Sequence, residues 1–336
     1  MSLPINEFLS APGIVLDVRS PGEYAQGRIP GAHNMPLFSD EERVAVGTVY
    51  KQVGQAEAIE LGLKIVGPKI AHIFKETQRI TGGLPAKIHC WRGGMRSSSV
   101  AQFLQSLGLK TLTLKGGYKS FRSWALKALE VRRLLCIVGG YTGSGKTAIL
   151  HILKERGEQV LDLEGIAHHR GSSFGMIGQP PQPSNEQFEN EVAVQWAAFD
   201  SSRPIWIEDE SRMIGLCRIP NTLFDQITAA PMLKVERPKS ERFRMLVDDY
   251  AHMDKDLLIA ATERLRKKLG GARTQKIISC IDPWDPAGLE VLMEYYDAAY
   301  EYSLQQRAQK AVSVSASSLS IAEWADTLIK AKPPIF

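Results

Sequence analysis

The sequence lacks long apolar runs and paired cysteine motifs. No stretch of about 18 apolar residues occurs, so no membrane-spanning helix is expected, and the first residues lack the basic-then-apolar order of a signal peptide. The 4 cysteines are scattered without a C-x-x-C pair, which argues against structural zinc and a redox dithiol. A net charge of +4 is too small to establish a polyanionic partner. These absences predict a cytoplasmic protein with free thiols, no membrane contact and no structural metal.

The composition is that of an ordinary globular protein, and two α/β patterns follow one another. With 336 residues, 44% of them hydrophobic and 23% charged, the chain can bury two cores. Strands alternating with helices predict two parallel, doubly wound sheets. We place a first domain at 1–128 and a second at 129–336. Strands are predicted at 14–18, 86–90, 111–114, 134–140, 159–163, 204–208 and 231–236, followed by a largely helical region at 239–309, a weak strand at 312–317 and a helix at 321–331.

A complete phosphate-binding pattern, G-x-x-x-x-G-K-S/T, follows the apolar strand at 134–140 and precedes a predicted helix at 147–157. Its glycines let backbone N–H groups surround phosphate oxygens, and the helix N-terminus adds positive potential. Lys146 supplies a charge, and the hydroxyl of Thr147 is a ligand for Mg²⁺. The predicted phosphate-binding residues are Gly140, Thr142, Gly143, Ser144, Gly145, Lys146 and Thr147.

A carboxylate is expected to hold Mg²⁺ beside this loop. Glu208 and Asp209 come just after the apolar part of the strand at 204–208, and Asp162 lies at the end of another strand. One or more of these three is the predicted metal-side group. The loop binds phosphate groups and does not contact the rest of the ligand. The pattern therefore leaves open whether the ligand is ATP or a diphosphate ester.

One cysteine lies where a reactive thiol is expected. Cys90 ends the strand at 86–90 and is followed by a glycine-containing loop and a helix. Loop N–H groups, a helix N-terminus and the guanidinium groups of Arg92 and Arg96 all stabilise a thiolate. A merely structural cysteine needs no Arg-Gly-Gly-x-Arg after it. Cys90 is therefore predicted to act with Arg92, Gly93, Gly94 and Arg96 as a catalytic loop.

Taken alone, this loop fits two chemistries. Residues 89–97 satisfy the H-C-x-x-G-x-x-R-S/T pattern of cysteine phosphatases, whose loop wraps a phosphate. The domain, however, resembles rhodanese: LDVRSPGEYAQGRIPGAHNMP (16–36) is similar to its opening signature, and LKGGYKSFR (114–122) to its closing one. Rhodanese-like domains carry sulfur or selenium on the loop cysteine. Dual-specificity phosphatases share the fold, so the fold alone leaves both chemistries open.

Further motifs extend the resemblance over nearly the whole chain. They are LDLEGIAHHRGSSFG (161–175), SNEQFENEV (184–192), IWIEDESRMIG (205–215) and RLRKKLGG (264–271). With the cysteine loop and the phosphate loop in this order, the chain resembles the tRNA 2-selenouridine synthases. The resemblance implies an α/β protein with a rhodanese-like domain and a P-loop domain, which modifies the wobble uridine in the anticodon loop of tRNA at C2.

The resemblance also implies two co-substrates. Geranyl diphosphate alkylates the sulfur of 2-thiouridine, and selenophosphate, supplied by another enzyme, replaces the S-geranyl group with selenium. It further implies that Cys90 holds or delivers selenium, with Arg92 and Arg96 on the anionic donor. Our own hypothesis is that the phosphate loop grips the prenyl diphosphate, and ATP as its ligand stays open. Whether Cys90 forms a perselenide stays open. Expected tRNA contacts are Arg264, Arg266, Lys267 and Lys268, because basic side chains bind the RNA backbone, and Arg170 is expected to meet either tRNA or a donor phosphate.

Two other classes of function remain on the residues alone. A cysteine phosphatase fused to a small-molecule kinase would use both loops, and it would hydrolyse a generic aryl phosphate. A noncatalytic tRNA-binding protein switched by nucleotides would use the phosphate loop and leave the Cys90 loop without a purpose.

Overall fold

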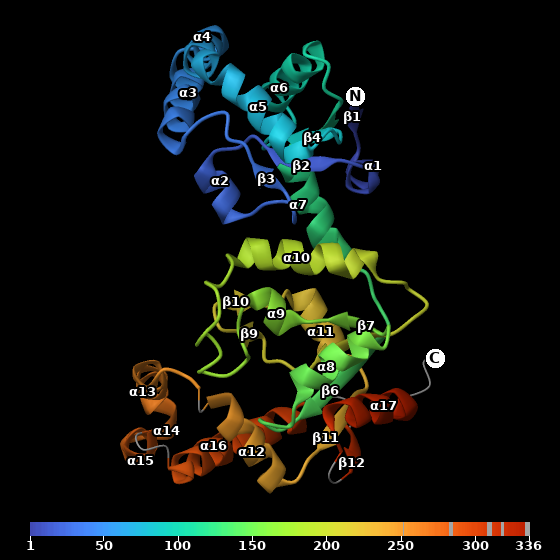
Figure 1. Ribbon diagram of the computed structural model, residues 1–336, viewed down its shortest axis with the longest axis vertical. Coiled ribbons are helices and arrows are strands. Elements are labelled where there is room, and N and C mark those ends of the chain that lie inside the picture. Colours follow the sequence, from blue (N-terminus) through green and yellow to red (C-terminus); the bar gives the residue numbers. More distant parts are fainter. Residues whose placement is uncertain (251, 282–284, 308–310, 317–318, 333–336) are drawn as a thin grey trace. The chain divides into compact units, whose positions relative to one another are not determined.

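The computed structural model describes residues 1–250, 252–281, 285–307, 311–316 and 319–332, and it consists of two compact units (Figure 1). Unit 1 holds residues 1–128 and 189–194, and unit 2 holds the rest of the chain. Each unit is built on its own parallel sheet with helices, so the predicted α/β class is confirmed. Across the described ranges, no helix has the length and apolarity needed to cross a membrane.

Unit 1 contains a five-stranded parallel sheet in the order β1-β5-β4-β2-β3. The chain leaves β2 toward β3 on one side and β4 toward β5 on the other, so the winding reverses between β2 and β4. Ligands of open α/β sheets bind beyond the strand ends at such a reversal. Cys90 follows β4 at this point. The strands are β1 (Ser2–Leu3), β2 (Ile14–Asp17), β3 (His33–Asn34), β4 (Ala86–His89) and β5 (Thr111–Leu114).

The helices of unit 1 begin and end at local capping signals. Ser39 and Glu42 form a capping box at the start of α3, and α5 ends at Gly82, which has a left-handed φ of 55°. Asn190 of α10 (Asn185–Ala198) packs in unit 1 and donates a hydrogen bond of 2.8 Å to the Tyr118 hydroxyl. The helices are α1 (Ile5–Ser10), α2 (Pro21–Gln26), α3 (Asp40–Gln52), α4 (Gln55–Val66), a 3₁₀ turn (Gly67–Lys69), α5 (Ile70–Thr81), α6 (Met95–Ser106) and α7 (Gly117–Ala128).

Unit 2 contains a second five-stranded parallel sheet, in the order β12-β11-β6-β8-β7. Every residue of β6 and β8 is buried, which is why both segments read as continuous apolar runs. The winding reverses between these two strands, so the phosphate loop after β6 and Glu208 at the end of β8 lie at the reversal. The strands are β6 (Leu135–Gly140), β7 (Gln159–Leu161), β8 (Ile205–Glu208), β11 (Met232–Glu236) and β12 (Val312–Ser315), with a separate antiparallel pair β9 (Met213–Ile214) and β10 (Cys217–Arg218).

The predicted strands of unit 2 at 134–140, 204–208 and 231–236 begin one residue later than expected, and those at 159–163 and 312–317 end two residues earlier. We expected a strand at 159–163, but β7 ends at Leu161 and a helix, α9 (Leu163–Ala167), begins two residues later. The reason is a cap: the Asp162 carboxylate accepts a hydrogen bond of 2.8 Å from the backbone N–H of Gly165. The other helices of the sheet layer are α8 (Lys146–Glu155), α11 (Asn221–Ala229) and α17 (Ile321–Ala331).

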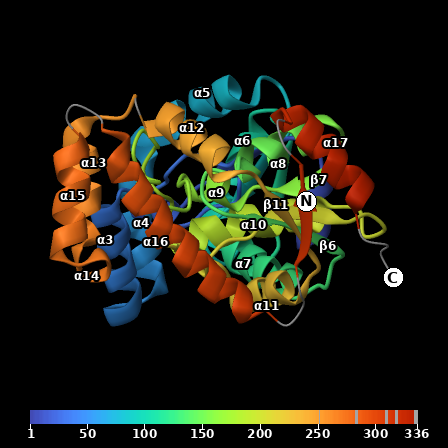
Figure 2. The same ribbon diagram turned by 90° about the horizontal axis from the view of Figure 1, so that it is seen from below.

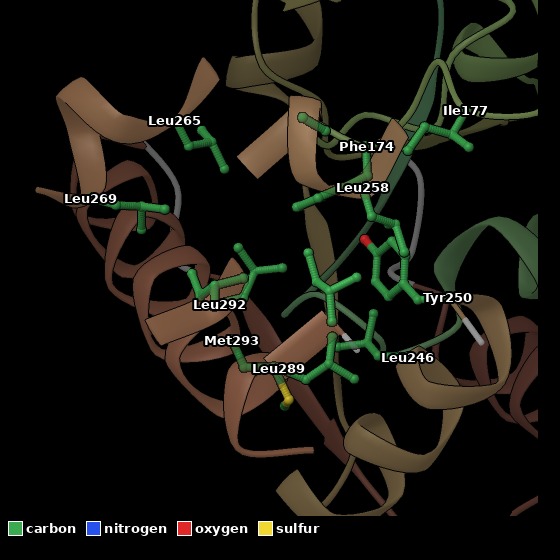
Figure 3. Packing of buried hydrophobic residues seen from close by; sticks show 13 residues of the cluster. Phe174, Ile177, Leu246, Tyr250, Leu258, Leu265, Leu269, Leu289, Leu292 and Met293 are labelled. Atoms are coloured by element: carbon green, nitrogen blue, oxygen red, sulfur yellow. The ribbon is translucent and has the colours of Figure 1, made fainter. Parts of the chain in front are cut away.

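The region after β11 is mostly helical, as predicted. Of the predicted helical region and the strand after it, positions 251, 282–284, 308–309 and 317 lie outside the described residues. Its short helices gather beside the long α16 in both views (Figure 2). They enclose an apolar cluster that includes Phe174, Leu246, Tyr250 and Leu258 (Figure 3). The helices are α12 (Lys239–Tyr250), α13 (Lys255–Arg264), α14 (Arg266–Leu269), α15 (Gly271–Ile281) and α16 (Pro286–Gln305).

Candidate functional site

Cys90 lies at the base of a loop of residues 90–94, here called the thiol loop, between β4 and α6. The side chain is only 3% exposed. Its sulfur lies 3.3 Å from the Ser97 hydroxyl and 3.9 Å from the Gly94 carbonyl oxygen. The first turn of α6 thus supplies the polar neighbours of the thiol, as expected for a cysteine placed at a helix N-terminus.

The N-terminus of α7 holds the thiol loop in place. The backbone N–H groups of Tyr118 and Lys119 donate to the carbonyl oxygens of Cys90 and Trp91, at 2.8 and 2.9 Å. Gly117 makes this approach possible: its φ is 59°, and a Cβ there would overlap the Cys90 oxygen and the Gly93 nitrogen. Gly117, the second glycine of the LKGGYKSFR motif, therefore allows α7 to pack against the loop.

We expect Gly117→Ala to destabilise the protein far more than a matched change at Gly82. Both glycines have a φ between 55° and 59°, but a Cβ at Gly82 meets nothing within 4 Å. Gly82→Ala should cost about 1 kcal/mol of unfolding free energy from backbone strain. Gly117→Ala should cost at least about 2 kcal/mol more, because backbone atoms must shift. Urea unfolding measures both, and equal losses would contradict this role of Gly117.

A buried charged network lies beneath the thiol loop. Asp17 and Arg19 are both fully buried and form an ion pair of 2.6 Å, while the guanidinium of Arg19 lies 3.8 Å from the ring centroid of Tyr118. His89 faces Asp17 at 3.7 Å. Burial lowers the pKa of His89, and Arg19 acts in the same direction, although Asp17 opposes it. The network joins β2, β4 and α7 under Cys90.

The two arginines of the predicted loop have different surroundings. Arg96 donates a hydrogen bond of 3.0 Å to the Glu23 carboxylate, which holds the pKa of Glu23 low against the opposing effect of its burial. Arg92 is exposed, next to the partly exposed Trp91. Arg92 is thus open to an incoming anion, whereas Arg96 already has one of its N–H groups engaged by Glu23.

The phosphate loop, residues 140–147, runs into α8, whose first turn contains Lys146 and Thr147. The ammonium of Lys146 donates to the Gly140 carbonyl oxygen at 3.0 Å and lies 3.5 Å from Glu208. The Ser144 hydroxyl oxygen is buried and has no hydrogen-bond partner among the described residues. The first N–H groups of α8 have no partner within the helix. Together these groups form a cradle that fits an anion of the phosphate type.

Three glutamates meet beside this cradle. Glu164 of α9, Glu208 and Glu210 bring carboxylate oxygens within 4.8 Å of one another. The Thr147 hydroxyl donates to Glu208 at 2.9 Å and is 3.2 Å from Glu164. Burial, reinforced by the charge of Glu208, raises the pKa of Glu164 to about 8. Burial raises the pKa of Glu208 and Glu210 as well, although the nearby ammonium of Lys146 opposes the shift in both.

The donor set of this cluster fits a hard divalent cation. Carboxylates and a threonine hydroxyl are the ligands that Mg²⁺ takes next to bound phosphates. A cation there would also offset the mutual repulsion of the three carboxylates. The loop after α9 closes on the cluster through Gly171, where a Cβ would lie 3.1 Å from a Glu210 oxygen and overlap Glu164.

Of the three carboxylates predicted for this role, the structure brings only Glu208 to the cluster. Asp162 caps α9 and lies 3.3 Å from His151, and Asp209 forms a buried ion pair of 2.7 Å with Arg307. Glu164 and Glu210 were not singled out from the sequence. The sequence could have indicated them by position, because Glu164 lies two residues after Asp162 and Glu210 lies two residues after Glu208.

Four of the five basic residues predicted to bind tRNA are exposed on the helical region, and the fifth, Arg170, is elsewhere. Leu265 and Leu269 point into the apolar cluster, while the residues between and beside them are exposed. Arg266 pairs with Glu263 at 2.6 Å. Arg264 at the end of α13, Arg266, Lys267 and Lys268 of α14, and Arg170 on the loop after α9 are all exposed.

Comparison with known proteins gives the same two-part organisation. Residues 5–123 match the model of the rhodanese-like domain, and residues 133–332 match that of the tRNA 2-selenouridine synthase AAA domain. The tRNA 2-selenouridine synthase of Marinobacter nauticus is 37% identical, with 93% of each chain covered. The enzyme of that name from Hydrogenovibrio crunogenus is 35% identical over 88% of this chain and 90% of its own, and that from Cronobacter sakazakii is 36% identical over 88% of both.

Proposed function

Since the chain belongs to the tRNA 2-selenouridine synthase family, we propose that it converts the wobble 2-thiouridine of tRNA into 2-selenouridine through an S-geranyl intermediate. The observation that carries this proposal is the presence in one chain of two complete anion-binding loops, one with a thiol and one with a lysine and clustered carboxylates. They match the two anionic co-substrates, selenophosphate and geranyl diphosphate.

The phosphate loop would serve the first step. The sulfur of 2-thiouridine attacks the first carbon of the geranyl group, the C–O bond to diphosphate breaks, and the N3 proton passes to solvent. Lys146 and the N–H groups at the start of α8 stabilise the charge that develops on the departing diphosphate. Glu164, Glu208, Glu210 and Thr147 would hold Mg²⁺, which neutralises diphosphate charge when bound.

The thiol loop would serve the second step. Selenium of selenophosphate adds to C2, the C2–S bond breaks and geranyl thiolate leaves, after which water cleaves the Se–P bond and releases phosphate. Alkylation in the first step makes the sulfur a better leaving group. Cys90 and Arg92 hold the donor. A perselenide on Cys90 is not part of this sequence, because selenium in selenophosphate is already fully reduced and an S–Se bond would require an added oxidant.

The test is nucleoside mass spectrometry of 2-thiouridine tRNA incubated with the enzyme, Mg²⁺, geranyl diphosphate and selenophosphate, without any nucleotide. S-geranyl-2-thiouridine should form with geranyl diphosphate alone, and 2-selenouridine once selenophosphate is added. Strict dependence of the first product on ATP hydrolysis would refute the role of the phosphate loop. Rapid hydrolysis of an aryl phosphate, lost in Cys90→Ala, would instead favour the phosphatase alternative.

Lys267→Ala combined with Lys268→Ala should weaken tRNA binding in a salt-dependent way. If each lysine contacts one phosphate, the slope of log K against log salt concentration should fall by about 2 in magnitude. The matched control is Lys51→Ala with Lys75→Ala, two exposed lysines of α3 and α5. Filter binding at several salt concentrations measures the slopes. Equal slopes for the two double variants would remove α14 from the tRNA-binding surface.

A further inference from the structure

The first residue of the phosphate loop is held by a side chain of α16, a contact that the proposed chemistry does not use. The strand β8 ends at Glu208, and its last bond to β6 runs from the backbone N–H of Asp209 to the Val138 carbonyl oxygen, at 3.0 Å. Because β6 and β8 are parallel neighbours, the next N–H of β6 on that side belongs to Gly140. This N–H donates to the hydroxyl of Tyr300 at 2.9 Å. A side chain thus takes the place of the strand beyond its end.

The glycine at position 139 lets this tyrosine reach the strand. A Cβ built on Gly139 would lie 2.7 Å from the hydroxyl oxygen of Tyr300. Gly139 stands outside the G-x-x-x-x-G-K-S/T pattern, so anion binding does not account for it. The ring of Tyr300 also packs edge-on against Tyr141 of the phosphate loop, with ring centroids 5.7 Å apart. Both chain neighbours of Gly140 therefore adjoin the same side chain.

A buried ion pair lies behind the tyrosine hydroxyl. Arg307 donates to the Asp209 carboxylate at 2.7 Å and to the Ile227 carbonyl oxygen at 2.8 Å, and the side chains of the pair are 6% and 10% exposed. Burial raises the pKa of Asp209, while the charge of Arg307 and a hydrogen bond from Tyr300 oppose the rise. A phenol that donates its proton to a carboxylate presents its oxygen lone pairs to other donors. The ion pair therefore orients the Tyr300 hydroxyl as an acceptor for the loop.

The carbonyl oxygen of Gly140 holds the functional cation of the loop. It accepts a hydrogen bond of 3.0 Å from the Lys146 ammonium, which lies 3.5 Å from Glu208. Gly140 has a φ of 150°, a conformation that residues with side chains rarely adopt. Since glycine has few steric limits of its own, its contacts must fix its orientation. A chain of contacts thus runs from Tyr300 through Gly140 to Lys146.

We propose that Tyr300 is a positioning residue for the phosphate loop, which fixes Gly140 so that the Lys146 ammonium meets the diphosphate without rearrangement. Asp209 orients the tyrosine and takes no part in metal binding. Groups that are oriented before the reaction stabilise developing charge most effectively, because no reorganisation is needed. This inference deepens the proposed function, since the ligand concerned is the diphosphate of the prenyl donor.

Tyr300→Phe removes the hydroxyl and keeps the ring. On the full chain with Mg²⁺, calorimetry should show inorganic diphosphate binding about fivefold more weakly, the effect of losing one hydrogen bond. Single-turnover S-geranylation at saturating donor should slow by a similar factor. Tyr302→Phe is the matched control, because Tyr302 lies on the same helix and is 69% exposed, and it should change neither quantity. An unchanged diphosphate affinity in Tyr300→Phe would overturn the inference.

A double-mutant cycle with Lys146→Ala separates positioning from general support of the fold. If Tyr300 acts through Lys146, adding Tyr300→Phe to Lys146→Ala should change the diphosphate affinity less than about twofold. An equal loss in both backgrounds would show a general effect on the fold and would overturn the inference. Coupled diphosphate binding in a protein that forms no S-geranyl-2-thiouridine would refute the proposed function and leave the positioning role standing.

A measurement on the unaltered protein keeps the inference testable if the variant folds poorly. Amide hydrogen exchange followed by NMR reports the protection of individual backbone N–H groups. The Gly140 N–H should exchange slowly before any ligand is added, because the Tyr300 hydroxyl already holds it. Fast exchange of this N–H in the free protein would show that the bond is absent and that Tyr300 does not position the loop.

Discussion

Lys146→Ala is expected to lower the rate of S-geranylation at least about 100-fold, the effect typical of removing one group that stabilises a developing negative charge. The ammonium lies within the phosphate loop, 3.0 Å from the Gly140 carbonyl oxygen and 3.5 Å from Glu208. Lys146→Ala removes the ammonium group that the loop would place beside the departing diphosphate. Single-turnover formation of S-geranyl-2-thiouridine measures the effect.

The matched control is Lys154→Ala, which removes an exposed lysine from the same helix. It should leave the rate unchanged. The selenium step gives a second comparison: when S-geranyl-2-thiouridine tRNA is supplied ready-made, Lys146→Ala should still form 2-selenouridine. A loss of both steps in Lys146→Ala, with the fold intact by circular dichroism, would contradict the assignment of this loop to the prenyl donor.

Cys90→Ala should have the opposite pattern. We expect S-geranylation to continue and selenium incorporation to fall at least about 100-fold, because the donor loses the group at the base of its loop. Ser99→Ala, an exposed position on α6, is the control. Mass spectrometry of the two modified nucleosides separates the steps within one experiment. An unchanged yield of 2-selenouridine would exclude Cys90 from the reaction.

The fate of the thiol provides a further check on the same step. Intact-protein mass spectrometry after anaerobic incubation with selenophosphate should show no selenium bonded to Cys90, since the proposed sequence of bonds needs no oxidant. A stable mass increase of one selenium atom that is absent in Cys90→Ala would show that Cys90 carries selenium covalently. The proposal that Cys90 only holds selenophosphate would then be wrong. Cys90→Ala would lose selenium incorporation in either case. The measurement therefore tests whether selenium is bonded to Cys90, and the variant tests whether Cys90 takes part in the step.

The parts of the fold that could be predicted are those set by local patterns. The strand at 111–114 and the helix at 321–331 have the observed bounds, because an alternating Thr-Leu segment and a capping box define them within a few residues. The two-residue strand β1 carries no such pattern and depends on its pairing with β5, 111 residues along the chain at Ser2 and Thr113. Pairing of this kind is a property of the tertiary structure.

The same distinction applies to the candidate sites. Lys146, Thr147 and Cys90 belong to motifs of eight or nine consecutive residues, so the sequence alone shows which functional groups lie together. The carboxylate cluster joins Glu164 to Glu208 and Glu210 across more than forty residues of sequence. The partner of Arg96 is Glu23, 73 positions away. Such partners are fixed by sheet order and burial, which a single sequence does not display.

Burial of Cys90 also affects how quickly its thiol is oxidised under oxidative stress. Conversion of cysteine to sulfenic and then sulfinic acid follows thiolate character and access to solvent. At 3% exposure, with Ser97 and Gly94 around the sulfur and the N-terminus of α7 fastening the loop, the thiol presents little surface to peroxide. The closed loop is therefore expected to slow oxidation of this thiol.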